Sequence, residues 1–473
     1  MEPKTKEFNS VAAEAIGNSR VQQNLQGLYR GFHALSQQAA RETDGWEQLR
    51  ERARAIKAHT IDNLDHYLEM AADRVTASGG NVYFAADAED ARRHVVNLAR
   101  SRNVKLVIKS KSMVSEEIGL NERLAEEGIE PVETDLGEYI IQLAEETPYH
   151  IIAPALHKSL SDVSELFQRK LRTPRYTEIS DLTREARTQL REKFFRADMG
   201  ITGANFIVAE TGTVVLVTNE GNGRMCTSMP RIHVAITGME KVVPSIEDMG
   251  VFLRLLIRSA TGQLISSYVT TVDGPRKSDD EDGPDEFHLV IVDNGRSKLL
   301  ADPELRESLY CIRCGACLNA CPVYRKVGGH AYGWVYPGPI GAVISPMLTG
   351  LSDAKDLPNA SSLCGACREA CPIKIDIPRM LLYLRKELNE GQTYPEERNS
   401  SFLERLSMRL WRRTVVSPRI FKLAGRVASV LQWPLARRGR IGWLPFPLSR
   451  WTRYRSFPAV VSRPFRSRWS DLE

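Results

Sequence analysis

Apolar and polar positions follow two different periods along the first 300 residues. Residues 1–75 carry apolar side chains at helical spacing with few Gly or Pro, which predicts helices over 11–16, 22–40 and 46–72. From residue 79 onward, short runs rich in Val and Ile are separated by longer amphipathic stretches, which predict strands and helices in turn. The predicted strands are 81–85, 105–109, 130–133 and 149–153, and the predicted helices are 88–102, 116–127 and 137–146. This succession indicates an α/β domain with a largely parallel sheet.

A second strand-rich stretch follows a charged helix that is predicted over 181–195. Its predicted strands are 206–210, 213–218, 232–237, 264–272 and 287–292, with a helix over 245–260 between them. The acidic segment 277–286 contains Pro and Gly and is predicted to be an exposed loop. We therefore expect the α/β region to extend to about residue 298.

The eight cysteines are concentrated in one region. Cys226 stands alone in the first 310 residues, and the other seven lie between positions 311 and 371. The first 20 residues are polar and lack the apolar core of a secretory signal, and no run approaches the roughly 18 apolar residues of a membrane span. We therefore expect a cytoplasmic protein, in which clustered cysteines indicate metal binding rather than disulfides.

The first cysteine motif has the spacing C-x2-C-x2-C-x3-C-P. It consists of Cys311, Cys314, Cys317 and Cys321, followed by Pro322. Three thiolates on one tight loop can hold three corners of an iron–sulfur cube, while the fourth points to a second cube. This is the pattern of bacterial two-cluster ferredoxins.

The second motif lacks its first cysteine. When the motif is aligned on its Cys-Pro end, Ser361 falls where that cysteine would stand, ahead of Cys364, Cys367 and Cys371. Cross-ligation then predicts two [4Fe–4S] clusters. The first is held by Cys311, Cys314, Cys317 and Cys371, and the second by Cys321, Cys364 and Cys367. The fourth position of the second cluster stays open to Ser361, to another oxygen or nitrogen ligand, to solvent, or to a three-iron cluster that leaves it empty.

Zinc is the alternative metal. Zinc sites usually join two separated C-x2-C pairs, with four ligands for each metal. Seven cysteines grouped as four and three, with both groups ending in Cys-Pro, do not fit that layout. Iron–sulfur clusters, which pass one electron at a time, are therefore the favoured interpretation.

Charge is distributed as unevenly as cysteine. The whole chain has a net charge of +5, yet residues 401–473 hold 16 Lys and Arg against three acidic residues, so the first 400 residues carry −8. The same tail contains five of the seven Trp. This change in composition indicates a domain boundary near residue 395, and residues 419–438 are predicted to form a basic amphipathic helix. Docking to a partner is the favoured role, with peripheral contact to an anionic membrane and nucleic-acid binding as alternatives.

Several other residues lie at predicted strand ends or turns, where α/β sheets bind ligands. They are Lys109, Lys111, His150, His157, Glu210, Thr211 and Gly212, and a structural role is favoured for each. His233, inside a predicted strand, is expected to pack in the core. Cys226 is expected to be an inert thiol in a polar loop, with redox activity as the alternative. The fragment Gly221-Asn222-Gly223 is interpreted as a plain turn rather than a nucleotide loop.

Nine further motifs are spread over nearly the whole chain. They are KSKSM at 109–113, EEIGL at 116–120, ETDLG at 133–137, EYIIQ at 138–142, PALHK at 154–158, ADMGITG at 197–203, AETGT at 209–213, DNGRS at 293–297 and YPGPIG at 336–341. Together with the two cysteine motifs, they resemble the lactate utilization protein B family. The missing cysteine of the second motif belongs to the pattern of that family.

The resemblance implies a fold, a role and partners. It implies an N-terminal LUD domain with a NagB/RpiA/CoA-transferase-like α/β fold, a mainly helical ferredoxin-type domain with two clusters, and a basic C-terminal region. We expect these parts at 1–75 (helical segment), 76–298 (LUD domain), 299–392 (ferredoxin-type domain) and 393–473 (basic region). The resemblance also implies an electron carrier in the oxidation of L-lactate to pyruvate, which enables growth on lactate. A cysteine-rich iron–sulfur subunit and a smaller LUD-only protein are the implied partners.

Two other functions stay open. The LUD domain itself could oxidise lactate or a related 2-hydroxy acid, with the clusters as its electron sink. Alternatively, the chain could be a redox-sensing protein that binds nucleic acid through its basic tail. Because the sequence has no P-loop and no recognisable flavin signature, the two-electron step of lactate oxidation is expected on a partner or at an interface.

Overall fold

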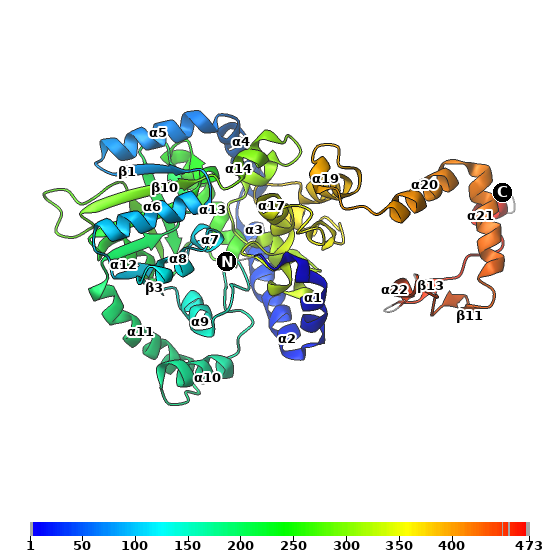
Figure 1. Cartoon of the computed structure of the whole chain (residues 1–473), viewed down its shortest axis with the longest axis horizontal. Helices are drawn as coiled ribbons and strands as arrows, with labels where there is room; N and C mark the ends of the chain where they lie inside the picture. Colours follow the sequence, from blue (N-terminus) through cyan, green and yellow to red (C-terminus); the bar gives the residue numbers. More distant parts are fainter. Residues whose placement is uncertain (1–2, 447, 453–454, 470–473) are drawn as a thin grey trace. The chain divides into compact units, whose positions relative to one another are not determined.

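In the computed structural model, a six-stranded sheet whose neighbouring strands are all parallel organises residues 81–292 (Figure 1). Its order is β1-β10-β7-β4-β2-β3. The strands are β1 (Asn81–Ala85), β2 (Leu106–Lys109), β3 (Glu130–Glu133), β4 (Met199–Thr202), β7 (Ile232–Gly238) and β10 (Glu286–Val292). The central strands are apolar and buried on both faces, which is usual in a parallel sheet. The predicted α/β fold is confirmed.

Helices cover both faces of this sheet. One face packs against α6 (Ala88–Ser101), α7 (Met113–Glu117) and α8 (Leu120–Glu126), and the other against α9 (Leu136–Ala144), α11 (Ile179–Arg196) and α12 (Asn222–Ser228). Val107 belongs to the first apolar layer and Ile108 to the second, because successive side chains of a strand point to opposite faces. A further helix, α10 (Leu160–Leu171), packs against α9 and α11.

A smaller four-stranded sheet has the order β8-β5-β6-β9. Its strands are β5 (Phe206–Val208), β6 (Thr213–Thr218), β8 (Val242–Val243) and β9 (Tyr268–Val272). Helix α13 (Ile246–Thr261) packs between β5 and the N-terminal helices. The smaller sheet therefore connects the large sheet to the start of the chain.

The N-terminal helices and the cysteine region share one apolar core with the smaller sheet. The N-terminal helices are α1 (Phe8–Gly17), α2 (Ser19–Leu28), α3 (Ala34–Glu42), α4 (Trp46–Asp62) and α5 (Leu64–Ala77), and those of the cysteine region are α14 (Arg296–Ala301), α15 (Ala316–Ala320), α16 (Tyr324–Val327), α17 (Gly338–Thr349), α18 (Ala366–Ala370) and α19 (Ile377–Glu390). Met1–Arg398 therefore form one compact unit. The structure describes residues 3–446, 448–452 and 455–469. The predicted division into four domains stays a prediction.

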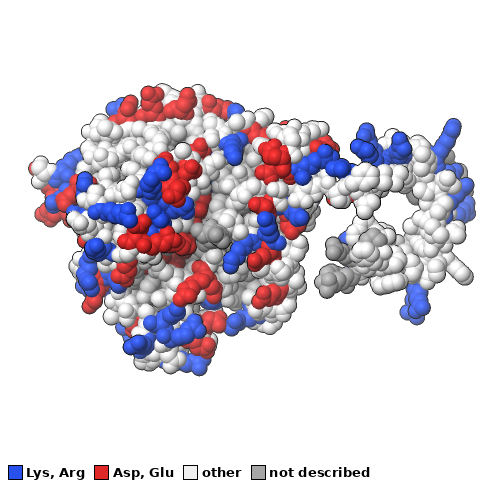
Figure 2. All heavy atoms as spheres, in the orientation of Figure 1, with Lys and Arg blue, Asp and Glu red and all other residues white. Residues whose placement is uncertain are grey.

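A second compact unit comprises Asn399–Glu473. Its elements are α20 (Phe402–Val416), α21 (Pro418–Leu431), β11 (Ala436–Arg437), β12 (Arg440–Ile441), α22 (Ser449–Thr452), β13 (Phe457–Pro458) and α23 (Phe465–Arg468). The predicted basic helix is present as α21, but it ends at Leu431 because Pro434 cannot continue it. Lys and Arg predominate among the charged residues of this unit, whereas Lys and Arg are mixed with Asp and Glu over the surface of the first unit (Figure 2). None of the described helices is long and apolar enough to cross a membrane.

Several local predictions differ from the structure. Residues 149–153 form bends instead of a strand, because Pro148 and Pro154 flank them and their apolar side chains pack against the cysteine loop. Strand β4 was not predicted, since Gly and Asp interrupt its short apolar run. The segment around Cys226, predicted to be a loop beginning with a turn, forms helix α12.

Candidate metal centre and adjoining cavity

The two cysteine loops have the same backbone conformation. Arg313 and Gly315 in the first loop have φ values of 60° and 75°, and Leu363 and Gly365 in the second have 55° and 84°. Each loop then enters a five-residue helix, α15 or α18. The glycine adopts the left-handed conformation without steric cost, so the loop can turn sharply between neighbouring cysteines.

Four thiols surround one small cavity. They are Cys311, Cys314, Cys317 and Cys371, and we call them the first thiol group. Burial, together with the nearby thiol of Cys311, raises the pKa of the Cys371 thiol to about 11. Burial likewise raises the pKa of Cys317 well above its usual range, with Cys311 and Cys314 adding to the effect. The last cysteine of the second motif thus joins the first three of the first motif.

The other three thiols form a second thiol group, Cys321, Cys364 and Cys367. Burial raises the pKa of Cys367 to about 12, and the neighbouring thiol of Cys321 contributes to the increase. Cys364 is exposed, and a hydrogen bond from Ser362 lowers its pKa. The thiol of Cys367 also influences Cys317, so the two groups are neighbours.

Ser361 stands in the second loop where Cys311 stands in the first. The backbone N–H of Arg313 donates to Sγ of Cys311 at 3.4 Å, and the backbone N–H of Leu363 donates to Oγ of Ser361 at 3.1 Å. Equivalent donors therefore bind a sulfur in one loop and an oxygen in the other. The serine hydroxyl therefore occupies the loop position that the register of the motifs predicts.

The donor chemistry of both groups fits iron–sulfur clusters. A thiol must lose its proton to bind a metal, and burial disfavours the resulting thiolate unless a cation is present. Buried thiols with raised pKa values, gathered around one cavity, would therefore become thiolates only together with a bound cation, which an iron–sulfur cluster supplies. All eight cysteines are free thiols, so disulfides do not compete for them.

Residues from the LUD region and from α4 hold the loops in place. His150 accepts a hydrogen bond from the backbone N–H of Ile152 through Nδ1, at 3.1 Å, and its Nε2 lies 3.0 Å from Oδ1 of Asn319 on α15. On the other side, the guanidinium of Arg50 donates to the carbonyl oxygens of Glu369 and Cys371. Both side chains are buried, and all these contacts lie within the first unit.

Comparison with known proteins accounts for almost the whole chain. Residues 68–292 match the LUD domain family, residues 307–375 the 4Fe-4S dicluster domain family, and residues 384–472 the C-terminal family of lactate utilisation protein B. Lactate utilization protein B of Bacillus velezensis is 44% identical over 470 residues, which cover 99% of this chain and 98% of that protein. The chain belongs to the lactate utilization protein B family.

A relative from another genus agrees with this assignment. Lactate utilization protein B of Oceanobacillus iheyensis is also 44% identical, over 97% of this chain and 95% of its own. The crystal structure of a DUF162 family protein from Deinococcus radiodurans aligns with a TM-score of 0.28 at 14% identity, covering 48% of this chain and 98% of that one. The resemblance inferred from the sequence motifs is confirmed.

This family member has a cavity of about 340 Å³ at the carboxyl edge of its large sheet, which we call the carboxyl-edge cavity. Residues that follow β2, β3, β4 and β7 line it. The order of the strands reverses between β2 and β4, and parallel sheets bind ligands at such a point. Ile151 and Arg313 line both this cavity and the space among the first thiol group, so a single layer of residues separates the two.

A buried ionic network forms the floor of the carboxyl-edge cavity. Both carboxylate oxygens of Glu117 accept from the Arg296 guanidinium, at 2.8 and 2.7 Å, and Arg296 Nε donates to Glu240 at 2.7 Å. The other oxygen of Glu240 accepts from Arg313 at 3.2 Å. Burial opposes ionisation of Glu240, but Arg296 and Arg313 outweigh it and hold its pKa at about 2. Lys241, next to Glu240, also lines the cavity.

Of the further candidates from the sequence, Lys111 lies in the carboxyl-edge cavity wall. Lys109 is buried beside it, but its ammonium group binds Asn121 and Glu133 at 2.6 and 2.5 Å. Glu210, Thr211 and Gly212 are not among the residues that line the cavity in the described part of the chain. Instead, the Glu210 carboxylate accepts from the backbone N–H of Ile246. The LUD fold therefore places only some of the candidate residues from predicted strand ends at the carboxyl-edge cavity.

Two predictions about single residues agree with the structure. His233 is buried in β7, where its Nε2 lies 2.9 Å from the Thr202 hydroxyl, and burial lowers its pKa to about 3. Cys226 is fully buried in α12, where burial raises its pKa to about 12. A thiol with so high a pKa is a poor nucleophile at neutral pH.

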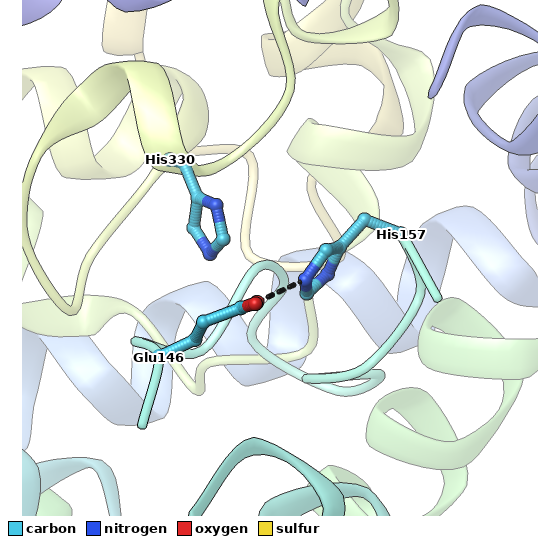
Figure 3. A group of neighbouring side chains, drawn as sticks. All are labelled: Glu146, His157 and His330. Atoms are coloured by element: carbon cyan, nitrogen blue, oxygen red, sulfur yellow. Dashed lines mark hydrogen bonds and ion pairs between the residues drawn. The ribbon is translucent and has the colours of Figure 1, made fainter. Parts of the chain in front are cut away.

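Glu146, His157 and His330 lie within 4.8 Å of one another through their ligand-type atoms (Figure 3). Their contacts favour a structural role over a metal site. Nε2 of His157 is 2.6 Å from the Glu146 carboxylate, whose other oxygen binds Lys158, and Nε2 of His330 donates to the carbonyl oxygen of Thr147 at 2.8 Å. The group therefore joins the end of α9 to the cysteine region.

Sequence reasoning missed the carboxyl-edge cavity floor. Glu117 and Arg296 lie in quoted motifs, but nothing local pairs residues 179 positions apart. Lys241 lies just beyond β7, a correctly predicted strand. A lysine near the carboxyl end of a buried strand was the signal that could have indicated this site.

Proposed function

We propose that this chain is the iron–sulfur electron-transfer subunit of a cytoplasmic system that oxidises L-lactate to pyruvate and so enables growth on lactate. The observation that carries the proposal is the grouping of seven cysteine thiols into sets of four and three within a 4Fe-4S dicluster domain. The lactate role follows from relatives named lactate utilization protein B at 44% identity over nearly the full length.

Within this proposal, each thiol group holds one [4Fe–4S] cluster. Cys311, Cys314, Cys317 and Cys371 bind the first, and Cys321, Cys364 and Cys367 bind the second. When bound, each cluster accepts and passes one electron at a time. Burial keeps water from Cys314, Cys317 and Cys371 of the first thiol group, whereas Cys311 is partly exposed and Cys364 of the second group lies at the surface. The exposed Cys364 side favours the second group as the point where electrons meet an external partner.

Partners are part of the proposal. We infer a cysteine-rich iron–sulfur subunit and a smaller LUD-only protein, with the basic second unit as the docking region. The apolar side chains of α20 and α21 are not buried within their own unit, in the ranges that the structure describes, and they alternate with Arg. Apolar and arginine-rich surfaces are typical of protein interfaces. We also propose the four parts 1–75, 76–298, 299–392 and 393–473 as functional divisions of the chain.

The test is an anaerobic assay of the full chain. The purified, reconstituted protein is mixed with L-lactate alone, or with L-lactate and the two partner subunits, and cluster reduction is followed by electron paramagnetic resonance. We expect several irons per chain, and reduction only when the partners are present. A colourless zinc protein would refute the cluster assignment, and reduction by lactate without partners would identify the LUD domain as the oxidising enzyme.

A further inference from the structure

The floor of the carboxyl-edge cavity contains polar groups that the protein leaves unused. Lys241 is 93% buried, and its ammonium group has no hydrogen bond or ion pair with any residue that the structure describes. Nη1 of Arg313 and Oγ1 of Thr237 are also buried, and neither has a hydrogen-bond partner within the described ranges. All three residues line the cavity. Unused buried donors are rare, because leaving one unpaired costs about 1–3 kcal/mol.

The charge of the floor favours an anion. Glu117 and Glu240 are neutralised by Arg296 and Arg313, with which they share close contacts. Lys241 feels the charge of the neighbouring Glu240, but its ammonium group makes no direct ion pair with a carboxylate of the described residues. The remaining acidic groups of the lining do not supply one, because Asp135 accepts hydrogen bonds from the start of α9 and Glu220 lies at the exposed rim. A ligand that brings its own negative charge would complete the floor.

The kinds of donor in the floor restrict the chemistry of the ligand further than charge alone does. A carboxylate has two oxygens, and a lysine with an arginine can each bind one of them. The Thr237 hydroxyl, at the end of β7, can donate to or accept from one further oxygen. Apolar side chains of Met113, Leu216 and Leu256 also line the cavity, together with polar ones such as Asn205, Asn222 and Gln263. The set therefore matches a carboxylate with an oxygen on the neighbouring carbon and a short apolar remainder.

We propose that the carboxyl-edge cavity binds a 2-hydroxy or 2-oxo monocarboxylate, with the carboxylate at Lys241 and Arg313 and the 2-oxygen at Thr237. L-Lactate and pyruvate are the members of this class that the proposed function supplies, so the choice of probes rests on that function. A ligand in this position lies one layer of residues from the first thiol group, because Arg313 lines both spaces. The LUD domain would then be the place where the substrate or product meets the electron-transfer chain.

Isothermal titration of the full chain, purified anaerobically, with L-lactate and with pyruvate tests the proposal. We expect binding of both, no binding of the neutral isostere L-lactamide, and weaker binding of propionate, which lacks the 2-oxygen. Lys241→Gln should weaken L-lactate binding about tenfold or more, because it removes a charge-assisted hydrogen bond. Lys241→Arg should restore most of the affinity. The matched control is Lys105→Gln, an exposed lysine at the amino edge of β2.

A second variant keeps the test decisive if Lys241→Gln does not fold. Thr237→Val preserves the side-chain volume, and we expect it to bring the affinity for L-lactate down to that for propionate. Equal binding of L-lactamide and L-lactate, or unchanged affinity in both variants, would overturn the site. Lactate-dependent cluster reduction without binding to this chain would overturn the site and leave the proposed function standing. Binding without reduction in the presence of partners would do the reverse.

Discussion

The guanidinium of Arg50 donates two hydrogen bonds to the carbonyl oxygen of Cys371, from Nε at 3.2 Å and from Nη2 at 2.7 Å. A helix near the start of the chain thereby fixes the residue that completes the first thiol group. Arg50 is buried, and its charge strengthens both bonds.

Arg50→Gln should therefore loosen the first thiol group. Hydrogen bonds from charged donors contribute about 1.5–3 kcal/mol each, so we expect a measurable loss of thermal stability together with a lower iron content per chain. The first cluster's resonance should decrease more than the second's. Arg52→Gln, on the same helix but paired with Asp248 at the surface, is the control and should retain its iron. Equal iron content in both variants would contradict the role of Arg50.

Ser361 gives a prediction about the second cluster. If its hydroxyl faces the fourth position, Ser361→Cys should yield a stable four-iron cluster with an altered midpoint potential, since a thiolate replaces an oxygen. Ser361→Ala should shift the second cluster toward a three-iron form with its own resonance. Ser362→Ala, which removes only the hydrogen bond to Cys364, is the matched control. Identical spectra of wild type and Ser361→Ala would exclude the serine.

The buried network under the carboxyl-edge cavity should be sensitive to loss of one charge. Glu117→Gln leaves Arg296 with Glu240 as its remaining carboxylate among the described residues. Breaking a buried ion pair by removing one partner costs about 3–5 kcal/mol. Urea denaturation followed by circular dichroism should show this loss, whereas Glu89→Gln, which breaks an exposed pair with Arg92, should leave the midpoint almost unchanged. A small effect of Glu117→Gln would mean that the network relaxes.

His233 predicts a pH dependence of stability. Burial lowers its folded pKa from 6.5 to about 3. Between these pH values the histidine is protonated in the unfolded chain but not in the folded chain. Its contribution is fully present above pH 6.5 and is lost at about 1.4 kcal/mol per pH unit as the pH falls toward 3. Between pH 6.5 and 4.5, the wild type should lose about 2–3 kcal/mol more than His233→Gln. His66→Gln, at an exposed position, should follow the wild type.

The second unit should be needed for assembly but not for iron. A chain ending at residue 398 should keep the iron content and spectra of the full protein, because the seven thiols lie in the first unit. It should no longer capture the cysteine-rich and LUD-only subunits in a pull-down. A smaller change, Trp411→Ala on α20, should weaken capture about tenfold or more if this exposed side chain anchors the interface. Unaffected capture by the shortened chain would contradict docking.

The sequence predicted those parts of the fold that repeat a local pattern. Strands rich in β-branched and aromatic residues, such as β1 and β6, and the amphipathic helix α6 were correctly placed. Strand β4 escaped because its Gly200 is required by packing: a Cβ there would come within 1.9 Å of the Cys226 carbonyl oxygen. That requirement arises from another element and leaves no apolar period in the strand itself.

The candidate site, too, was predictable from the sequence only in part. The spacing of the cysteines indicates that they bind iron–sulfur clusters. The role in lactate oxidation was inferred only from the family resemblance. The carboxyl-edge cavity did not emerge, because its floor is assembled from Glu117, Glu240, Arg296 and Arg313, which lie far apart in the sequence and are adjacent only after folding. Charged residues in a helix or turn are usually solvent-facing, so local pattern gave no reason to bury them.

The contact between Arg50 and Cys371 also has a consequence for biosynthesis. The two residues are 321 positions apart. At a translation rate of 5–20 residues per second, the ribosome releases the arginine roughly 15–60 s before the cysteine. Cys311 is made only 60 residues before Cys371, so for roughly 3–12 s the nascent chain holds Cys311, Cys314 and Cys317 without the fourth thiol of their group and without the carbonyl that α4 binds. Iron delivery is therefore best timed after translation has passed residue 371, and premature loading would find an open, oxygen-accessible set of thiols.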